Sequence, residues 1–210
     1  MSGQPVELVQ REGGELVEAT LLDGLTAKDL LVVERAWAPT RAGLIAELLK
    51  RGVPRPEWPQ SVHWDWSRKA PELHLLQASG FGIVTGSEWQ GALMTKTAAC
   101  VARLKDDSGK PLVYVDFLEA APWNWRVKPL GQVGRFKGVG ALLFREAVLQ
   151  SMREGFHGRV GLHSLPQAES FYDQECGMTR VAPDPKKQNL VYFEFTRQQA
   201  QRFLQKGSKP

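Results

Sequence analysis

The residues with the clearest chemical potential lie in a short glycine-containing stretch at the start of a predicted helix. The stretch reads Arg135-Phe136-Lys137-Gly138-Val139-Gly140-Ala141. The first amide N–H groups of a helix have no partners inside the helix, and the helix dipole adds partial positive charge there. Glycine lets a phosphate approach these groups closely. The stretch therefore predicts a pyrophosphate site, although a glycine-rich helix start that binds nothing has the same pattern.

Two other phosphate-binding motifs fail at specific positions. A Walker A loop requires Lys and then Ser or Thr after its last glycine, whereas Val139 follows Gly138. A dinucleotide-binding fingerprint requires a third glycine where Leu143 stands, and it belongs to the first strand–helix unit of a chain. No residues stand at metal-ligand spacing either. The sequence therefore argues against a nucleotide-hydrolysing or metal-dependent enzyme.

Two motifs together resemble the GNAT N-acetyltransferase superfamily. Arg135-x-x-Gly138-x-Gly140 is similar to the family signature Q/R-x-x-G-x-G/A, which follows the fourth strand and binds the pyrophosphate of acetyl-coenzyme A. The segment from Ala168 to Met178 resembles the second family motif, usually written A-x-x-x-Y-x-x-x-G-F, with Met178 in place of the phenylalanine. One predicted helix and one predicted strand separate the two motifs, as that fold requires. The resemblance covers residues 73 to 196.

The resemblance implies a mixed α/β sheet with helices on both faces, the GNAT-like acyl-CoA N-acyltransferase fold. It also implies acetyl-CoA as the co-substrate, held by the stretch from Arg135 to Ala141, with no metal. A primary amine would attack the thioester directly in a ternary complex. The Ala-Pro-Trp-Asn stretch at 121–124, together with residues 161–166, resembles a less-studied bacterial subgroup.

The same resemblance assigns Tyr172 as the general acid beside the coenzyme sulfur. The alternative is a core tyrosine next to Phe171. A proton acceptor would come from strand ends, where Glu119, Asp116 and His163 stand, and strand alternation puts Asp116 and Glu119 on opposite faces. Glu119 is the first choice because it is nearest to the expected separation of the strands, with a water relay as the alternative.

A loop from Pro122 to Gly134, here called the inserted loop, is longer than the corresponding loop in many family members. It carries Trp123, Asn124 and Trp125. Indole rings of this kind are usually covered from water. These side chains either line the acceptor site or anchor the loop.

The chain that must position these residues divides into a front part and a core. Residues 1–72 are predicted to be an N-terminal strand and helical part of the same domain, which walls the acceptor side, and residues 73–210 the acetyl-CoA-binding core. Thr26 caps a helical pattern over residues 26–52, which Pro39 is expected to divide into two helices. Residues 53–72 are rich in proline and tryptophan, which predicts an ordered irregular connection.

From residue 73 onwards the pattern alternates between strands and helices. Expected strands cover residues 73–78, 81–85, 89–104, 112–119, 159–163 and 189–195. Expected helices cover residues 139–154, 166–176 and 198–205, and Gly177 is expected to cap the second of them. A crossover would make strands 112–119 and 159–163 parallel neighbours.

The composition places the chain among globular proteins. It has 210 residues, of which 42% are apolar and 24% charged, unlike a disordered or coiled-coil chain. No run approaches the ~20 apolar residues of a membrane span, and the N-terminus lacks the apolar core of a signal peptide. Cys100 and Cys176 have no CxxC spacing. These features predict a reduced, cytoplasmic protein without a membrane partner.

The sequence does not identify the acceptor amine. A small metabolite, a peptide N-terminus, a lysine and an aminoacyl-tRNA all carry a suitable amine. The net charge of +4 is spread without a basic block, so charge alone does not predict a nucleic-acid partner, although a tRNA acceptor stays open. The competing hypothesis is an inactive acyl-CoA-binding or interaction module on the same fold, in which Tyr172 would be expendable. We expect a monomer or a homodimer.

Overall fold

The computed structural model describes residues 2–206, which form two compact units. Unit 1 comprises residues 2–93 and 118–143, and unit 2 comprises residues 94–117 and 144–206. Among the described residues, no helix has the length and apolar character needed to cross a membrane.

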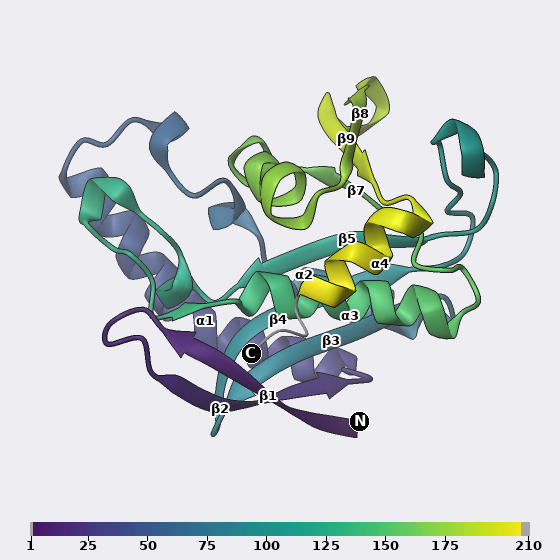
Figure 1. The fold of residues 1–210 in the computed structure, drawn as a ribbon. Helices are drawn as coiled ribbons and strands as arrows, with labels where there is room; N and C mark the ends of the chain where they lie inside the picture. Colours follow the sequence, from purple (N-terminus) through teal and green to yellow (C-terminus); the bar gives the residue numbers. More distant parts are fainter. Residues whose placement is uncertain (1, 207–210) are drawn as a thin grey trace. The chain divides into compact units, whose positions relative to one another are not determined.

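A strand hairpin comes first along the described chain, then a long helix and short helices, and after them strands interspersed with helices (Figure 1). The strands are β1 (Ser2–Gln10), β2 (Leu16–Asp23), β3 (Ala78–Thr85), β4 (Glu88–Lys96), β5 (Val113–Ala120), β6 (Phe136–Lys137), β7 (Val160–Ser164), β8 (Thr179–Asp184) and β9 (Leu190–Glu194). The α-helices are α1 (Ala27–Lys50), α2 (Trp66–Lys69), α3 (Val139–Arg153) and α4 (Arg197–Lys206). The strand predicted over residues 89–104 is shorter than expected, because β4 ends at Lys96.

The strands of unit 1 lie in the order β6-β1-β2-β3-β4. The β1–β2 hairpin is antiparallel from Ser2 opposite Asp23 to Val9 opposite Leu16, and β2 is antiparallel to β3. Leu8 on one strand of the hairpin is fully buried. One face of the hairpin is therefore packed and the other is solvated, as is usual for antiparallel strands.

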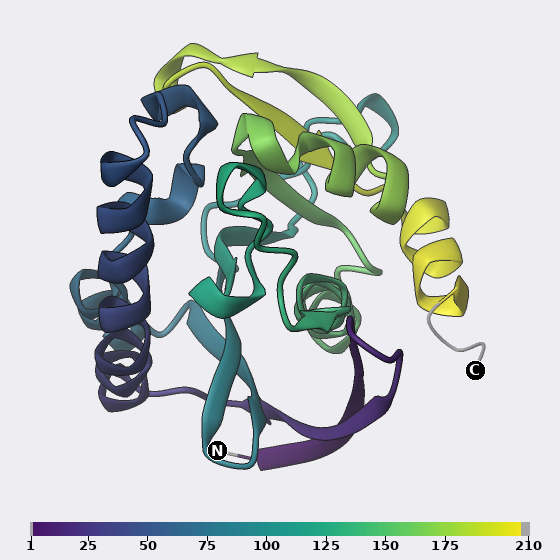
Figure 2. The ribbon, with the colours of Figure 1, turned by 90° about the vertical axis from the view of Figure 1, so that its left-hand side faces the viewer.

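Helix α1 is one continuous helix, which corrects the prediction of two helices divided at Pro39 (Figure 2). Thr26 caps the helix as predicted, since its hydroxyl accepts the Asp29 N–H while Asp29 Oδ2 accepts the Thr26 N–H at 2.7 Å. A proline inside a helix removes one N–H donor and crowds the preceding turn. Burial of Trp37 and Arg41 on the two sides of Pro39 offsets this cost.

Residues 53–74 form the irregular connection that the sequence predicts. They contain the short 3₁₀ helices η1 (Arg55–Glu57), η2 (Gln60–His63) and η3 (Ala70–His74), with α2 between the last two. The strand predicted over residues 73–78 is wrong, because η3 occupies its first part and β3 begins only at Ala78. The apolar pattern misled there because Leu76 is fully exposed.

The strands of unit 2 lie in the order β5-β7-β9-β8. β5 and β7 are parallel, with Val113 opposite Val160, which confirms the predicted crossover. β9 is antiparallel to both β7 and β8. The core of this unit is aromatic: the ring of Phe144 on α3 lies 5.5 Å from the rings of Phe195 and Phe203.

The helix predicted over residues 166–176 changes type along its length. It begins as the 3₁₀ helix η7 (Pro166–Ala168) and ends as the π-helix η8 (Phe171–Cys176). Gly177 caps it as predicted, with φ +76° and its N–H donated to the Tyr172 carbonyl. Four residues separate Tyr172 from Gly177, one more than in the family motif. The wider turn of a π-helix accommodates the additional residue.

Candidate active site

The predicted pyrophosphate loop, residues 135–141, ends in the first turn of α3. The Leu142 N–H donates to the Gly138 carbonyl at 2.9 Å. The N–H groups of Val139, Gly140 and Ala141 therefore precede the first helical hydrogen bond. Gly138 has φ +88°, which favours glycine, and a Cβ built on it would meet no atom within 4 Å. Open space thus lies beside a helix start, an arrangement that suits an anion such as a phosphate.

Strand β4 holds the start of α3 through close packing at Gly91. A Cβ at residue 91 would lie 2.6 Å from Val139 Cγ1 and 2.8 Å from Leu143 Cδ1. Both of these helix side chains are buried. Only glycine allows so close an approach, so Gly91 sets the distance between β4 and the first turn of the helix.

The N-terminal hairpin also holds the pyrophosphate loop. Phe136 and Lys137 form β6, which pairs antiparallel with Gln10 and Val9 of β1. The backbone N–H of residue 11 adds a hydrogen bond of 2.8 Å to the carbonyl of residue 135. A two-residue strand carries no periodic pattern, so this pairing could not be predicted from the sequence.

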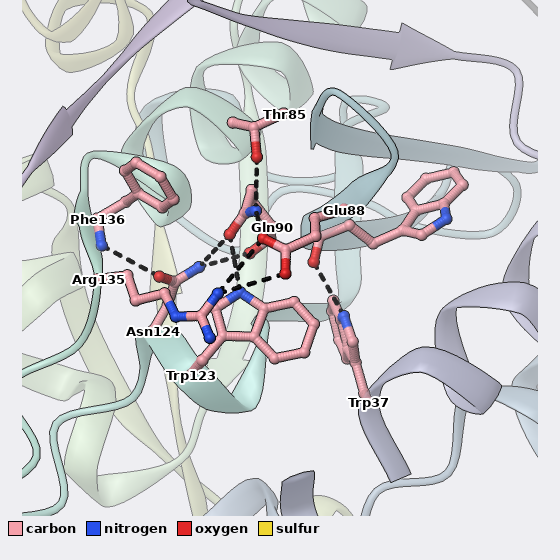
Figure 3. A network of polar contacts seen from close by, with 9 residues as sticks. Trp37, Thr85, Glu88, Gln90, Trp123, Asn124, Arg135 and Phe136 are labelled. Atoms are coloured by element: carbon pink, nitrogen blue, oxygen red, sulfur yellow. Dashed lines mark hydrogen bonds and ion pairs between the residues drawn. The ribbon is translucent and has the colours of Figure 1, made fainter. Parts of the chain in front are cut away.

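Gln90 of β4 lies at the centre of a polar network that joins β4 to the inserted loop (Figure 3). Its side-chain oxygen accepts Trp123 Nε1–H at 2.9 Å and Asn124 Nδ2–H at 3.0 Å, and its Nε2 donates to Thr85 Oγ1 at 2.7 Å. Asn124 Oδ1 accepts the Phe136 N–H at 3.1 Å. The network therefore links β4, the inserted loop and the pyrophosphate loop through the buried amides of Gln90 and Asn124, whose hydrogen bonds are satisfied.

The inserted loop is anchored by its own side chains, the second of the two predicted roles. Trp125 is buried, and its Nε1–H donates to the Ala120 carbonyl at 2.8 Å. Gly134 has φ +85°, and a Cβ there would lie 2.4 Å from the Asn124 carbonyl oxygen. The loop closes on itself at this glycine, immediately before the pyrophosphate loop begins.

Arg135, the first residue of the family signature, has an acidic partner. Its Nη1 lies 3.3 Å from Glu88 Oε1, and its guanidinium lies 5.4 Å from the centre of the Trp123 ring (Figure 3). The ion pair is exposed to solvent on both sides, so it contributes little to stability. A contact between the Arg135 side chain and a coenzyme stays a prediction.

Glu119, at the end of β5, is a buried carboxylate of unit 1. The Trp66 Nε1–H donates to its Oε2 at 2.7 Å, while Oε1 is buried and has no hydrogen-bond partner of good geometry in the described part of the chain. Burial raises the pKa of Glu119 to about 7. The Ser61 hydroxyl and the Trp66 indole favour the charged form, as do the positive charges of Arg41 and Lys69, but burial outweighs them.

Tyr172, the predicted general acid, lies in the aromatic core of unit 2. The rings of Phe144, Phe171 and Phe193 lie 5.6, 5.0 and 6.1 Å from its own ring. Burial raises the pKa of the phenol above its usual value, so the hydroxyl is protonated at neutral pH. A general acid needs this state, but a core tyrosine has the same surroundings. The catalytic role of Tyr172 therefore stays a prediction.

The two other predicted proton acceptors have partners of their own in unit 2. Lys96 Nζ lies 2.6 Å from Asp116 Oδ2. His163 Nδ1 lies 2.7 Å from Tyr114 Oη, and its Nε2 lies 3.1 Å from Asp184 Oδ2. Burial lowers the pKa of His163, and the neighbouring carboxylate acts in the opposite direction. Both groups are engaged, unlike Oε1 of Glu119, which is buried without a hydrogen bond of good geometry.

Comparison with known proteins identifies the fold. No protein-family model and no curated protein sequence matches the chain. An uncharacterised protein from Bacillus halodurans matches with TM-score 0.57 and 9% identity, over 96% of this chain and 94% of that one. An N-acyl amino acid synthase from uncultured soil microbes matches with TM-score 0.54 and 12% identity, over 88% and 93%. An aminoglycoside acetyltransferase in complex with coenzyme A and kanamycin matches with TM-score 0.53 and 16% identity, over 88% and 98%.

These matches concern the arrangement of strands and helices. The chain has the mixed α/β fold of the GNAT acyltransferases, which confirms the fold expected from the two sequence motifs. Residues 135–141 follow β5 in the chain and lead into α3, and coenzyme binding by them stays a prediction.

Proposed function

We propose that the protein is an acyl-CoA-dependent N-acyltransferase, which transfers an acetyl group from acetyl-CoA to a primary amine. The observation that carries the proposal is the start of α3, where three amide N–H groups follow an open, left-handed Gly138 on an acyltransferase fold. A helix start of this kind favours a pyrophosphate over a neutral ligand.

The pyrophosphate loop fits a coenzyme through its backbone. The open space at Gly138 is where a phosphate oxygen can approach without meeting a side chain. Lys137 is exposed beside it and adds positive charge. The Gln90–Asn124 network already holds the loop, so binding costs little additional ordering of the backbone.

Acyl transfer to an amine needs a proton acceptor and a proton donor. We assign the first role to Glu119, because its buried Oε1 lacks a hydrogen bond of good geometry and burial raises its pKa to about 7. The amine nitrogen attacks the thioester carbonyl carbon, a C–N bond forms and the C–S bond breaks. The surplus proton of the amine passes to Glu119, and the departing thiolate takes a proton from water or from a protein group such as the phenol predicted from the family motif.

The solved structures support the class of acceptor. One neighbour is an aminoglycoside acetyltransferase and another is an N-acyl amino acid synthase; both names describe acyl transfer, and the second places the acyl group on nitrogen. We therefore expect a small-molecule or peptide amine as the acceptor. Because the second name says acyl and not acetyl, an acyl chain longer than acetyl is a second candidate for the transferred group.

Release of free thiol tests the proposal. The protein is incubated with acetyl-CoA and a panel of amines, which includes aminoglycosides, polyamines, amino acids and peptides, and the thiol is followed with a chromogenic disulfide. We expect release that depends on at least one amine and is lost in Gly138→Glu. Coenzyme binding without release for any amine would favour the acyl-CoA-binding module instead.

A further inference from the structure

Trp66 connects the buried carboxylate of Glu119 to a second pair of charges, formed by the half-buried Glu34 and the buried Arg41. Its indole Nε1–H donates to Glu119 Oε2 at 2.7 Å, and its backbone N–H donates to Glu34 Oε2 at 2.9 Å. Arg41 extends the chain with its two Nη atoms 3.0 and 3.1 Å from the Glu34 carboxylate. Trp66 itself is 0% exposed. The indole is thus held through its backbone as well as through its ring.

Packing fixes the plane of the indole. Trp37 of α1 meets Trp66 edge to face, with ring centres 6.0 Å apart and an interplanar angle of 89°. The Nε1–H of Trp37 donates in turn to the Trp89 carbonyl at 3.0 Å (Figure 3). Asp65 caps the turn that begins at Trp66, since its carboxylate accepts the Ser67 N–H at 2.9 Å. These contacts hold the Trp66 indole in the orientation in which its Nε1–H points at Glu119 Oε2.

The two oxygens of the Glu119 carboxylate therefore differ in their hydrogen bonding. Oε2 of Glu119 is occupied by the indole, whereas Oε1 is buried and lacks a partner of good geometry among the described residues. A buried acceptor without a partner is costly, and in a native protein it calls for an explanation such as a catalytic role. The Ser61 hydroxyl also interacts with this carboxylate, but not with the geometry of a full hydrogen bond to Oε1. Oε1 is therefore the Glu119 oxygen that keeps acceptor capacity for an N–H or O–H group.

We propose that Trp66 is a positioning residue for Glu119, because its indole holds Oε2 and so keeps Oε1 available for the proton of the acceptor amine. The catalytic part of this proposal rests on the proposed function, but the hydrogen bond can be tested without turnover. The groups that face Glu119 are Ser61 in η2, Trp66 and Lys69 in α2, and Arg41 in α1. Removing the indole N–H leaves the hydroxyl and both positive charges in place.

The test compares Trp66→Phe with Trp37→Phe. Both variants remove a fully buried indole N–H, and Trp37→Phe also loosens the packing against Trp66. Only Trp66→Phe removes the hydrogen bond to Glu119. We expect the pKa of Glu119 to rise by about one to two units in Trp66→Phe and to stay unchanged in Trp37→Phe. Carbon-13 NMR of labelled glutamate carboxyls measures it, and Glu119→Gln identifies the signal.

The rate provides a second readout that a purely structural role would not change. Because one pKa unit is a tenfold change in the charged fraction below the pKa, kcat/KM of Trp66→Phe should fall about tenfold or more at slightly acidic pH. It should recover at alkaline pH, where Glu119 is charged again. Trp37→Phe should keep the pH profile of the wild-type protein.

A closer replacement covers the case in which Trp66→Phe does not fold. Benzothienylalanine at position 66 keeps the bicyclic shape of the indole and replaces the N–H with sulfur, so it should raise the pKa of Glu119 without opening a cavity. An unchanged pKa in this protein, or an equal shift in Trp37→Phe, overturns the proposal. A shifted pKa without acyl transfer by the wild-type protein supports the coupling and overturns the proposed function.

Discussion

Asn124 Oδ1 accepts the Phe136 N–H at 3.1 Å, so a side chain of the inserted loop holds the strand that leads into Gly138. The other end of the same amide is held by Gln90, whose carbonyl and side-chain oxygens lie 3.2 and 3.0 Å from Asn124 Nδ2. The inserted loop adds residues between β5 and α3. Through the Asn124 amide it also fixes the backbone of the pyrophosphate loop to β4.

Asn124→Ala should weaken coenzyme binding as well as stability. The Phe136 N–H loses its acceptor, a loss of about 1–3 kcal/mol when the group stays buried, and the pyrophosphate loop loses its support. Gln132→Ala is the matched control, because it removes two amide hydrogen bonds to carbonyls of the same loop but none to Phe136. We expect calorimetry to show severalfold weaker coenzyme binding in Asn124→Ala alone. Equal affinity loss in both variants would contradict the role of Asn124.

Gly138→Glu should abolish coenzyme binding, because a negative charge and a side chain would occupy the space intended for the pyrophosphate. The control is Gly52→Glu, just after α1. Gly52 also has a positive φ, +64°, and a Cβ there would also meet nothing within 4 Å. Both variants place a negatively charged side chain at a positive φ. Unchanged coenzyme affinity in a folded Gly138→Glu protein would rule out this binding site.

Glu119→Gln should flatten the pH dependence of stability. Below pH 4.5, the ordinary pKa, the carboxyl is neutral in both folded and unfolded states. Between pH 4.5 and about 7 it ionises only in the unfolded chain, so the folded wild-type protein loses up to about 1.4 kcal/mol per pH unit. The wild-type protein should therefore lose roughly 3 kcal/mol relative to Glu119→Gln over this interval. Denaturant unfolding measures the difference, and parallel pH curves would disprove the raised pKa.

Tyr172→Phe separates a general acid from a core residue. If the phenol protonates the leaving thiolate, kcat should fall about tenfold or more while coenzyme affinity changes little. Tyr192→Phe is the control, because Tyr192 is also buried and its hydroxyl donates to Glu194 Oε2 at 2.9 Å. That variant should lose stability and keep its turnover. Full turnover in Tyr172→Phe would contradict the general-acid role, and solvent would then protonate the thiolate.

The parts of the fold that the sequence predicts are those that depend on neighbouring residues. Thr26 with Asp29 and Gly177 each satisfy a local backbone requirement, a helix cap, and the structure confirms both. The division of α1 at Pro39 was wrong because burial on both sides of the proline is a tertiary effect that outweighs local propensity.

The parts that the sequence does not predict depend on distant residues. The indole of Trp66 and the carboxylate of Glu119 are 53 positions apart, and Gln90 and Asn124 are 34 positions apart. No periodicity or spacing connects such pairs, since the fold alone brings them together. The only feature of the sequence that points to Gln90 is its place in an apolar strand, where a buried amide needs hydrogen-bond partners.

The most direct test of acyl transfer follows the acyl group itself. Acetyl-CoA labelled with carbon-13 in its acetyl group is incubated with the protein and the amine that best stimulates thiol release, and the amine is then analysed by mass spectrometry. The proposed function predicts one labelled acetyl group on the amine nitrogen for each thiol released, with neither product formed by Gly138→Glu. Thiol release that leaves the label in free acetate, with the amine unmodified, would contradict it.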